Sequence, residues 1–174
     1  MDKARILGEV TTRIGVKQDS DKGKHLSLML DVLEKLSGSS LVFKGGSCIL
    51  ICHKGTRFSE DLDFDAFAPR NLRSLLGSLA SKYRAMGLDY KVENPKNTTT
   101  SSRYNIVVSG DDFRGLKLKI DISLRDLNYG VEKPKVEQSN GIEAYPLKDI
   151  FNQKSKRCSR VREKQSKNKI QRHI

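Results

Sequence analysis

The spacing of apolar residues along this chain changes from a helical period to a strand period and back. Between Lys24 and the serine- and glycine-rich segment at residues 37–40, apolar residues recur every three or four positions, which predicts an amphipathic helix. The same spacing from Leu72 to Tyr83 predicts a second helix. The first twenty residues are more polar and predict one short helix followed by a loop.

Five segments have the composition and the two-residue alternation of strands: 41–44, 61–67, 88–93, 103–110 and 116–124. Residues 47–52 predict a short helix, residues 94–102 a hairpin loop, and Pro146 the first turn of a last helix. The resulting order, α-β-α-β-α-β-β-β-α, indicates an α/β (α+β) domain in which helices flank a small mixed β-sheet.

The strand at 61–67 carries the most informative polar residues. Acidic and apolar residues alternate strictly, which places Asp61, Asp63 and Asp65 on one face. Two aspartates one residue apart on a strand can both reach a divalent cation, and Mg²⁺ is usually held by one or two carboxylates together with substrate phosphates. Asp121, on the polar face of the strand at 116–124, is the candidate for a third carboxylate. We therefore expect Mg²⁺ or Mn²⁺ as a cofactor.

Gly45-Gly46-Ser47 lies between a predicted strand and a predicted helix. A turn of this kind offers backbone N–H groups to phosphate oxygens, because glycine lets the backbone approach a ligand closely. Arg57 and Lys54, in the loop that follows, can neutralise further phosphate charge. This segment therefore predicts a site for the phosphates of a nucleotide.

Other interpretations of these residues require letters that the sequence lacks. The phosphate-binding pattern G-x-x-x-x-G-K-[ST] is absent. An EF-hand loop beginning at Asp61 needs Gly at its sixth position and Glu at its twelfth, where this chain has Ala66 and Leu72. Cys48 and Cys52 share a helical face, but no convincing further zinc ligand follows, so we interpret them as small buried apolar residues.

Composition adds a division of the chain by charge. The 174 residues carry a net charge of +12, and residues 151–174 alone hold nine Lys/Arg and one acidic residue. We predict a catalytic core over 1–150 and a basic helical segment over 151–174 that attracts phosphate backbones, although a solvated terminus is an equally weighted interpretation. The sequence has no apolar run of membrane-spanning length and no secretory leader, and its cysteine count is odd, so we expect a cytoplasmic protein without membrane contact.

The strings "LVFKGGS" and "RFSEDLDF" resemble the AbiEii/AbiGii family of nucleotidyltransferase toxins, within the DNA polymerase β-like nucleotidyltransferase superfamily. The resemblance is strongest over residues 25–68 and continues weakly to Asp121 and Lys154. It implies the nucleotidyltransferase fold and metal-dependent transfer of a nucleotide from an NTP to an acceptor, with an RNA end, that of tRNA in particular, expected. It also implies a type IV toxin–antitoxin or abortive-infection system and a cognate antitoxin as partner.

The resemblance also implies individual roles. Metal binding would fall to Asp61, Asp63 and Asp121, which with Lys154 would form the catalytic set. Nucleotide binding would fall to Gly45, Gly46, Ser47, Arg57, Ser59 and Arg160.

The segment after Arg160 departs from the family pattern. Members usually continue with an Arg-Asp-x-x-Asp segment and a helical domain, and residues 161–174 supply no such aspartates. This departure supports an alternative function, that of a truncated, catalytically inactive relative that binds nucleotide, RNA or antitoxin. A simple RNA-binding protein is a third hypothesis, ranked last because no aromatic platform is visible. A small-molecule acceptor stays open as well, because a fold does not fix the acceptor.

Overall fold

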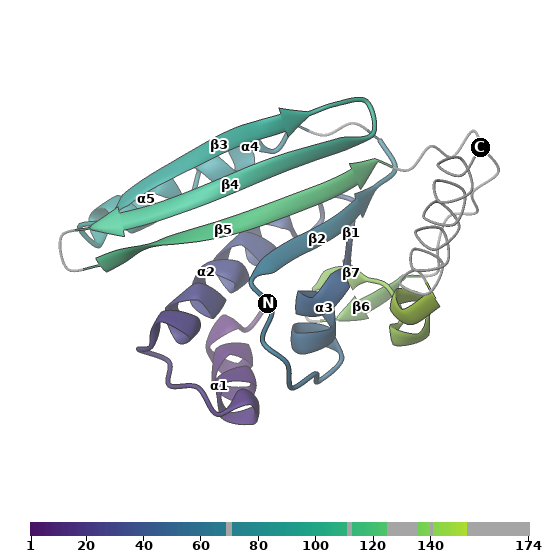
Figure 1. The fold of residues 1–174 in the computed structure, drawn as a ribbon, viewed down its shortest axis with the longest axis horizontal. Coiled ribbons are helices and arrows are strands. Elements are labelled where there is room, and N and C mark those ends of the chain that lie inside the picture. Colours follow the sequence, from purple (N-terminus) through teal and green to yellow (C-terminus); the bar gives the residue numbers. More distant parts are fainter. Residues whose placement is uncertain (69–70, 111–112, 125–135, 140, 153–174) are drawn as a thin grey trace, which may run out of the picture.

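The computed structural model describes residues 1–68, 71–110, 113–124, 136–139 and 141–152. They contain one seven-stranded mixed sheet with the strand order β3-β4-β5-β2-β1-β7-β6 (Figure 1). The strands are β1 (Leu41–Lys44), β2 (Asp61–Ala66), β3 (Asp89–Asn97), β4 (Ser101–Gly110), β5 (Phe113–Leu124), β6 (Glu137–Ser139) and β7 (Ile142–Ala144). The helices are α1 (Lys3–Ile14), α2 (Asp21–Leu36), α3 (Gly45–Cys52), α4 (Arg73–Gly77) and α5 (Ala80–Ala85).

The two faces of the sheet differ in what covers them. Helices α2, α4 and α5 lie behind the sheet in Figure 1, whereas none of the described helices lies over the front of β3, β4 and β5. The apolar side chains of β2 and β5 point toward the helices, and Leu62, Phe64 and Ile120 are at most 1% exposed. Their polar neighbours, which alternate with them, face the open side. The mixed α/β class expected from the sequence is confirmed.

Helices α1 and α2 begin at capping residues. The Asp2 side chain accepts a hydrogen bond from the backbone N–H of Arg5, and the Ser20 side chain accepts one from Gly23. The apolar spacing alone placed the start of α2 near Lys24, and the Ser20 cap accounts for the earlier start at Asp21.

The single helix predicted from Leu72 to Tyr83 is wrong: two short helices, α4 and α5, occupy this region. Gly77 ends α4, and glycine is a poor helix former. The Ser78 hydroxyl donates to the Leu75 carbonyl, and the backbone N–H of Leu79 bonds to Leu76 in a tighter turn. Most of the predicted apolar face survives the break, since only Leu75 of its residues is exposed, at 36%. The others are buried: Leu72, Leu76, Leu79 and Tyr83.

The predicted hairpin loop over 94–102 is also too long. Strand β3 continues to Asn97 and β4 starts at Ser101, which leaves residues 98–100 as the connection. The pairing register shifts between Glu93 and Lys96, so that Pro95 lies at an irregularity of the edge strand, where the missing N–H of proline is tolerated. Thr98 closes the turn, since its hydroxyl and its backbone N–H both donate to the carbonyl of Ser101.

Strands β6 and β7 were not predicted, and they raise the number of strands from five to seven. Each has three residues, too few for an alternation to stand out, and they are joined through Gly141 at φ +81°. Strand β7 lies parallel to β1, with Ala144 opposite Phe43. Residues 147–152 are helical after Pro146, as predicted. The rest of the predicted basic segment lies outside the described residues.

No helix in the described ranges combines the length and the apolar character that a bilayer crossing requires.

Candidate active site

Strands β2 and β5 are parallel neighbours in the centre of the sheet, and their register brings the predicted carboxylates together. Asp63 lies opposite Asp121, and Asp61 lies opposite Lys119. All four alternate with buried apolar residues of their strands, so their side chains share the face opposite that apolar layer. Residues far apart in the sequence thus meet on one surface, because both strands alternate with the same phase.

Two of the three carboxylates are already paired with cations. The Arg103 guanidinium on β4 holds Asp121 with two hydrogen bonds, Nε to Oδ1 at 2.6 Å and Nη2 to Oδ2 at 3.1 Å. The Lys119 ammonium is 2.5 Å from Asp61 Oδ2 and 3.9 Å from Asp121 Oδ2. The pairs are partly exposed, with 41% of the Arg103 side chain and 29% of the Asp121 side chain accessible. Such pairs are weak enough to exchange partners.

Asp63 has a different environment from its two neighbours. Within the described part of the chain, no cation forms a salt bridge with its carboxylate. Burial raises the pKa of Asp63 above its ordinary value, the charge of Lys44 acts against this, and the nearby carboxylates of Asp121 and Asp61 raise the pKa further. The site therefore holds a half-buried carboxylate for which a nearby positive charge would be favourable.

The glycine turn lies directly against this carboxylate. Gly45 begins α3 with φ +81°, and a Cβ there would come within 2.4 Å of Asp63 Oδ2. A Cβ on Gly46 would come within 2.7 Å of the Ser59 hydroxyl. Only glycine leaves room for these contacts. The N-terminus of α3, whose first backbone N–H groups have no acceptor within the helix itself, is thereby placed next to Asp63.

Ser47 is inside the protein and not on the surface of the turn. The residue is 0% exposed. Its hydroxyl donates to the backbone carbonyl of Asp61 and, at 3.4 Å, to that of Ser59. The side chain therefore ties α3 to the start of β2, and what Ser47 can offer a phosphate is its backbone.

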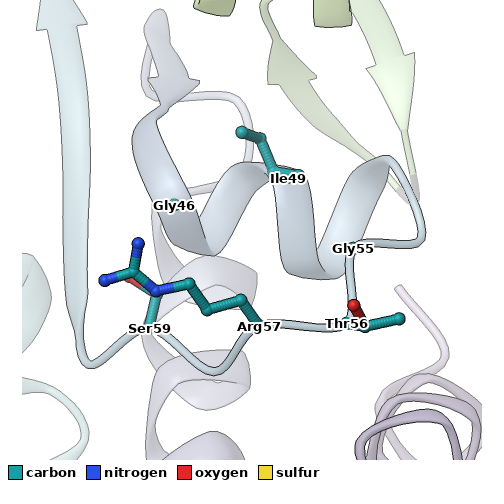
Figure 2. A pocket seen from close by; sticks show the side chains of 6 residues that line it. All are labelled: Gly46, Ile49, Gly55, Thr56, Arg57 and Ser59. Carbon is teal, nitrogen blue, oxygen red and sulfur yellow. The ribbon is translucent and has the colours of Figure 1, made fainter.

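A cavity of about 470 Å³ opens beside the glycine turn (Figure 2). Its wall brings together Gly46 and two further predicted site residues, Arg57 and Ser59. In Figure 2 the Arg57 side chain runs along the loop and places its guanidinium beside Ser59, on the side of Gly46. A wall with one cation, hydroxyl groups and glycine backbone suits an anionic ligand. The rest of the lining is Ile49, Gly55 and Thr56.

Asp65 shares the face of Asp61 and Asp63 but belongs to the interior. It is 0% exposed, forms a 2.5 Å ion pair with Lys44 and accepts a 2.9 Å hydrogen bond from the Tyr145 hydroxyl. The Lys44 ammonium also donates to the Ser123 hydroxyl at 3.3 Å. This network joins β1, β2 and β5 to the residue after β7. Asp65 is therefore bound within the interior, apart from Asp61 and Asp63.

Sequence reasoning missed four polar residues of this region: Lys44, Arg103, Lys119 and Tyr145. Two of them had a signal, because Lys119 alternates in phase with Asp121, and Lys44 ends the strand before the glycine turn. The other two depend on which strands pair and in what register, which short-range patterns do not reveal. Lys154 and Arg160, predicted for the triphosphate, lie outside the described residues.

The oxygen donors fit a hard divalent cation by their chemistry, since three carboxylates share one face. Among the described residues, however, no three His, Cys, Asp or Glu side chains converge as a ready cation site. Asp61 and Asp121 contact Lys119 and Arg103 instead. Joint binding of one ion by these carboxylates therefore requires side-chain rotation.

The two described cysteines are apolar in character. Cys48 is 0% exposed, as predicted, and Cys52 is partly buried against the same core. A hydrogen bond with Cys52, together with burial, raises the pKa of the Cys48 thiol far above its ordinary value. Cys48 is therefore a neutral thiol at working pH.

The family model described as nucleotidyl transferase AbiEii toxin, type IV toxin–antitoxin system, matches residues 28–169 of this chain. Among curated proteins, no match was found.

Solved structures resemble the chain at the level of the fold. A candidate nucleotidyltransferase from H. pylori superposes with a TM-score of 0.64 and 26% identity, over 75% of this chain and 56% of that one. JHP933 from Helicobacter pylori gives 0.62 and 26%, over 78% and 56%. The nucleotidyltransferase toxin MenT4 from Mycobacterium tuberculosis H37Rv gives 0.40 and 17%, over 82% and 48%, a likeness too weak to carry an argument. The chain thus spans just over half the length of the first two.

Proposed function

Because the chain belongs to the AbiEii family of nucleotidyl transferase toxins of type IV toxin–antitoxin systems, we propose that it transfers a nucleotide from an NTP to a hydroxyl of an acceptor. The observation that carries this proposal is the pairing of Asp63 with Asp121 next to the glycine turn at Gly45. Carboxylates beside a phosphate-binding turn are what nucleotidyl transfer requires, since it needs both a bound triphosphate and oxygen ligands for a divalent cation.

Asp61, Asp63 and Asp121 would hold Mg²⁺ or Mn²⁺. When bound, such an ion polarises the phosphoryl oxygen and lowers the pKa of a coordinated hydroxyl. The raised pKa of Asp63 supports this assignment, because a half-buried carboxylate among like charges is suited to a cation.

The chain's own groups would bind and orient the triphosphate. The backbone N–H groups at the start of α3 and the guanidinium of Arg57 would contact phosphate oxygens, and Ser59 would add its hydroxyl. The acceptor oxygen then attacks the α-phosphorus, the bond from that phosphorus to the bridging oxygen breaks, and pyrophosphate leaves. The hydroxyl proton passes to solvent. Lys154 and Arg160 would contact the outer phosphates.

We further propose an RNA end, tRNA in particular, as the acceptor, the cytoplasm as the compartment, and a cognate antitoxin as the partner. The net charge of +12 supports a polyanionic acceptor, because excess basic charge attracts phosphate backbones.

A second candidate function is binding of nucleotide, RNA or antitoxin without catalysis. The observation that favours it is that Asp121 and Asp61 are already in ion pairs, Asp121 with Arg103 and Asp61 with Lys119. If these ion pairs never open, the protein would retain the nucleotide pocket without a working metal site.

The test is a transfer assay with each α-³²P-labelled NTP, Mg²⁺ and total tRNA. We expect wild type to label RNA and Asp63→Asn to lose at least about 100-fold of the rate, since loss of one carboxylate ligand disables metal binding. Asp89→Asn is the matched control, because Asp89 is an exposed aspartate at the far end of the same sheet.

Wild-type labelling with the control unaffected and Asp63→Asn inactive would support the proposal. Equal turnover by Asp63→Asn would overturn the site. Nucleotide binding by wild type without transfer would favour the binding-only candidate.

A further inference from the structure

The two hydrogen bonds from Arg103 to Asp121 set this pair apart from the other contacts around the candidate site. The Arg103 guanidinium contacts both carboxylate oxygens of Asp121, at 2.6 and 3.1 Å. Lys119, in contrast, contacts Asp61 through a single oxygen. A guanidinium fork fixes the plane of a carboxylate, whereas an ammonium acts as a point charge. Arg103 therefore determines the orientation of Asp121 in the metal-free protein.

The strand order determines toward which strand the Asp121 carboxylate turns. Strand β5 lies between β4, which carries Arg103, and β2, which carries Asp63. Asp121 is opposite Arg103 on one side and opposite Asp63 on the other. The fork thus draws the Asp121 carboxylate toward β4 and away from Asp63. The lack of a converged cation site among the described residues agrees with this arrangement.

The contact between Arg103 and Asp121 also has an electrostatic effect. Paired residues on neighbouring strands are about 5 Å apart at Cα, so Asp63 and Asp121 repel each other when both are ionised. A cation on Asp121 reduces this repulsion, and a divalent ion would do the same from between the two. Arg103 and the divalent ion therefore compete for the same oxygens.

We propose that Arg103 is a positioning residue that holds Asp121 in the metal-free protein and gives it up when a divalent cation binds, and thereby sets the cation concentration that the site requires. This inference rests on the proposed function, because it assumes that Asp121 is a metal ligand. Because the Arg103 and Asp121 side chains are both partly exposed, they have room to separate when the cation binds. The released guanidinium then lies on the open face of the sheet beside the carboxylates.

The test measures binding of Mn²⁺ alone, without nucleotide, by calorimetry on the full chain. Arg103→Met roughly keeps the length of the side chain and removes its charge and its donors. A positive charge within a few ångströms of a carboxylate changes the affinity of that carboxylate for a cation by about one logarithmic unit or more. We therefore expect the Kd for Mn²⁺ to tighten roughly tenfold in this variant. Arg103→Lys keeps the charge without the fork and should give an intermediate Kd.

The matched control is Lys117→Met. Lys117 is exposed, lies two residues from Lys119 on the same face of β5, and loses the same formal charge. Its distance from Asp121 is about 13 Å along the strand, beyond a Debye length in physiological salt, so its Kd should stay within about twofold of wild type.

Thermal unfolding supplies a second readout. We expect Arg103→Met to lower Tm in EDTA and saturating Mn²⁺ to restore most of the difference. An unchanged or weaker Kd in Arg103→Met, with a Tm loss equal in EDTA and Mn²⁺, would overturn the proposal and leave Arg103 a structural residue. If wild type and Arg103→Met both bind no Mn²⁺ without nucleotide, the proposal for Arg103 fails, whereas the proposed function is tested separately by the transfer assay, in which substrate phosphates also hold the ion.

Discussion

Gly45 shows how much of the candidate site depends on one residue. It combines a left-handed backbone, φ +81°, with a neighbour that leaves no room for a side chain, Asp63 Oδ2. Gly38 has a similar backbone, φ +75°, but nothing lies within 4 Å of the position that its Cβ would take. Comparing alanine substitutions at Gly38 and Gly45 therefore separates the cost of backbone strain from the cost of displacing the Asp63 carboxylate.

We predict that Gly38→Ala lowers the free energy of unfolding by about 1 to 2 kcal/mol, the ordinary cost of a left-handed alanine. Gly45→Ala should cost more, because the new methyl group also has to push the Asp63 carboxylate aside. It should lower nucleotide transfer at least about tenfold, while Gly38→Ala keeps full activity. Urea unfolding and the transfer assay check both claims. Equal losses of activity in the two variants would show that the contact with Asp63 has no role.

At the scale of elements, Asp31 on α2 joins three helices. Its carboxylate is 2.7 Å from the ammonium of Lys3 on α1 and 2.5 Å from that of Lys82 on α5. The Tyr83 hydroxyl donates to it at 2.9 Å. Only 4% of the Asp31 side chain is exposed. Helices α1, α2 and α5 are therefore connected through one buried acid.

This acid should contribute to a pH dependence of stability. Burial raises the pKa of Asp31, but the hydrogen bonds from Lys3, Lys82 and Tyr83 outweigh it and hold the pKa below the ordinary 3.8. A carboxyl group that is more acidic when folded stabilises the protein above its unfolded pKa, and this contribution is lost as the pH falls below about 4.

We predict that Asp31→Asn loses about 2 kcal/mol at pH 7, because Lys3, Lys82 and the buried Tyr83 hydroxyl lose a charged acceptor. The difference from wild type should shrink toward pH 2. Urea midpoints measured at pH 7, 4 and 2 give the comparison. A difference that stays constant over this range would contradict the assignment.

The same scale shows what the sequence could and could not predict. Strict alternation along β2 and β5 was sufficient to place Asp61, Asp63 and Asp121 on polar faces, because the side-chain period of a strand is fixed. The contact between Arg103 and Asp121 was not predictable in this way, since it depends on the register between β4 and β5. Strands β6 and β7 were missed because three residues carry too little pattern.

The whole molecule combines a family membership with carboxylates that are paired within the candidate site. The family match over residues 28–169 supports the enzyme class, and the fold agrees with solved structures at 26% identity. The open face of the sheet carries carboxylates that contact basic side chains of the same chain. The central claim is the proposal that this site transfers a nucleotide, which would require these ion pairs to open.

The most direct measurement compares two labels on the same NTP, in the α and in the γ position, with Mg²⁺ and total tRNA as acceptor. Nucleotidyl transfer leaves the α-phosphate in the product and releases the γ-phosphate in pyrophosphate. We predict RNA labelled by α-³²P and not by γ-³²P, with labelling abolished in Asp63→Asn. Label on RNA from the γ position, or no label from either with the natural nucleotides tested in turn, would contradict it.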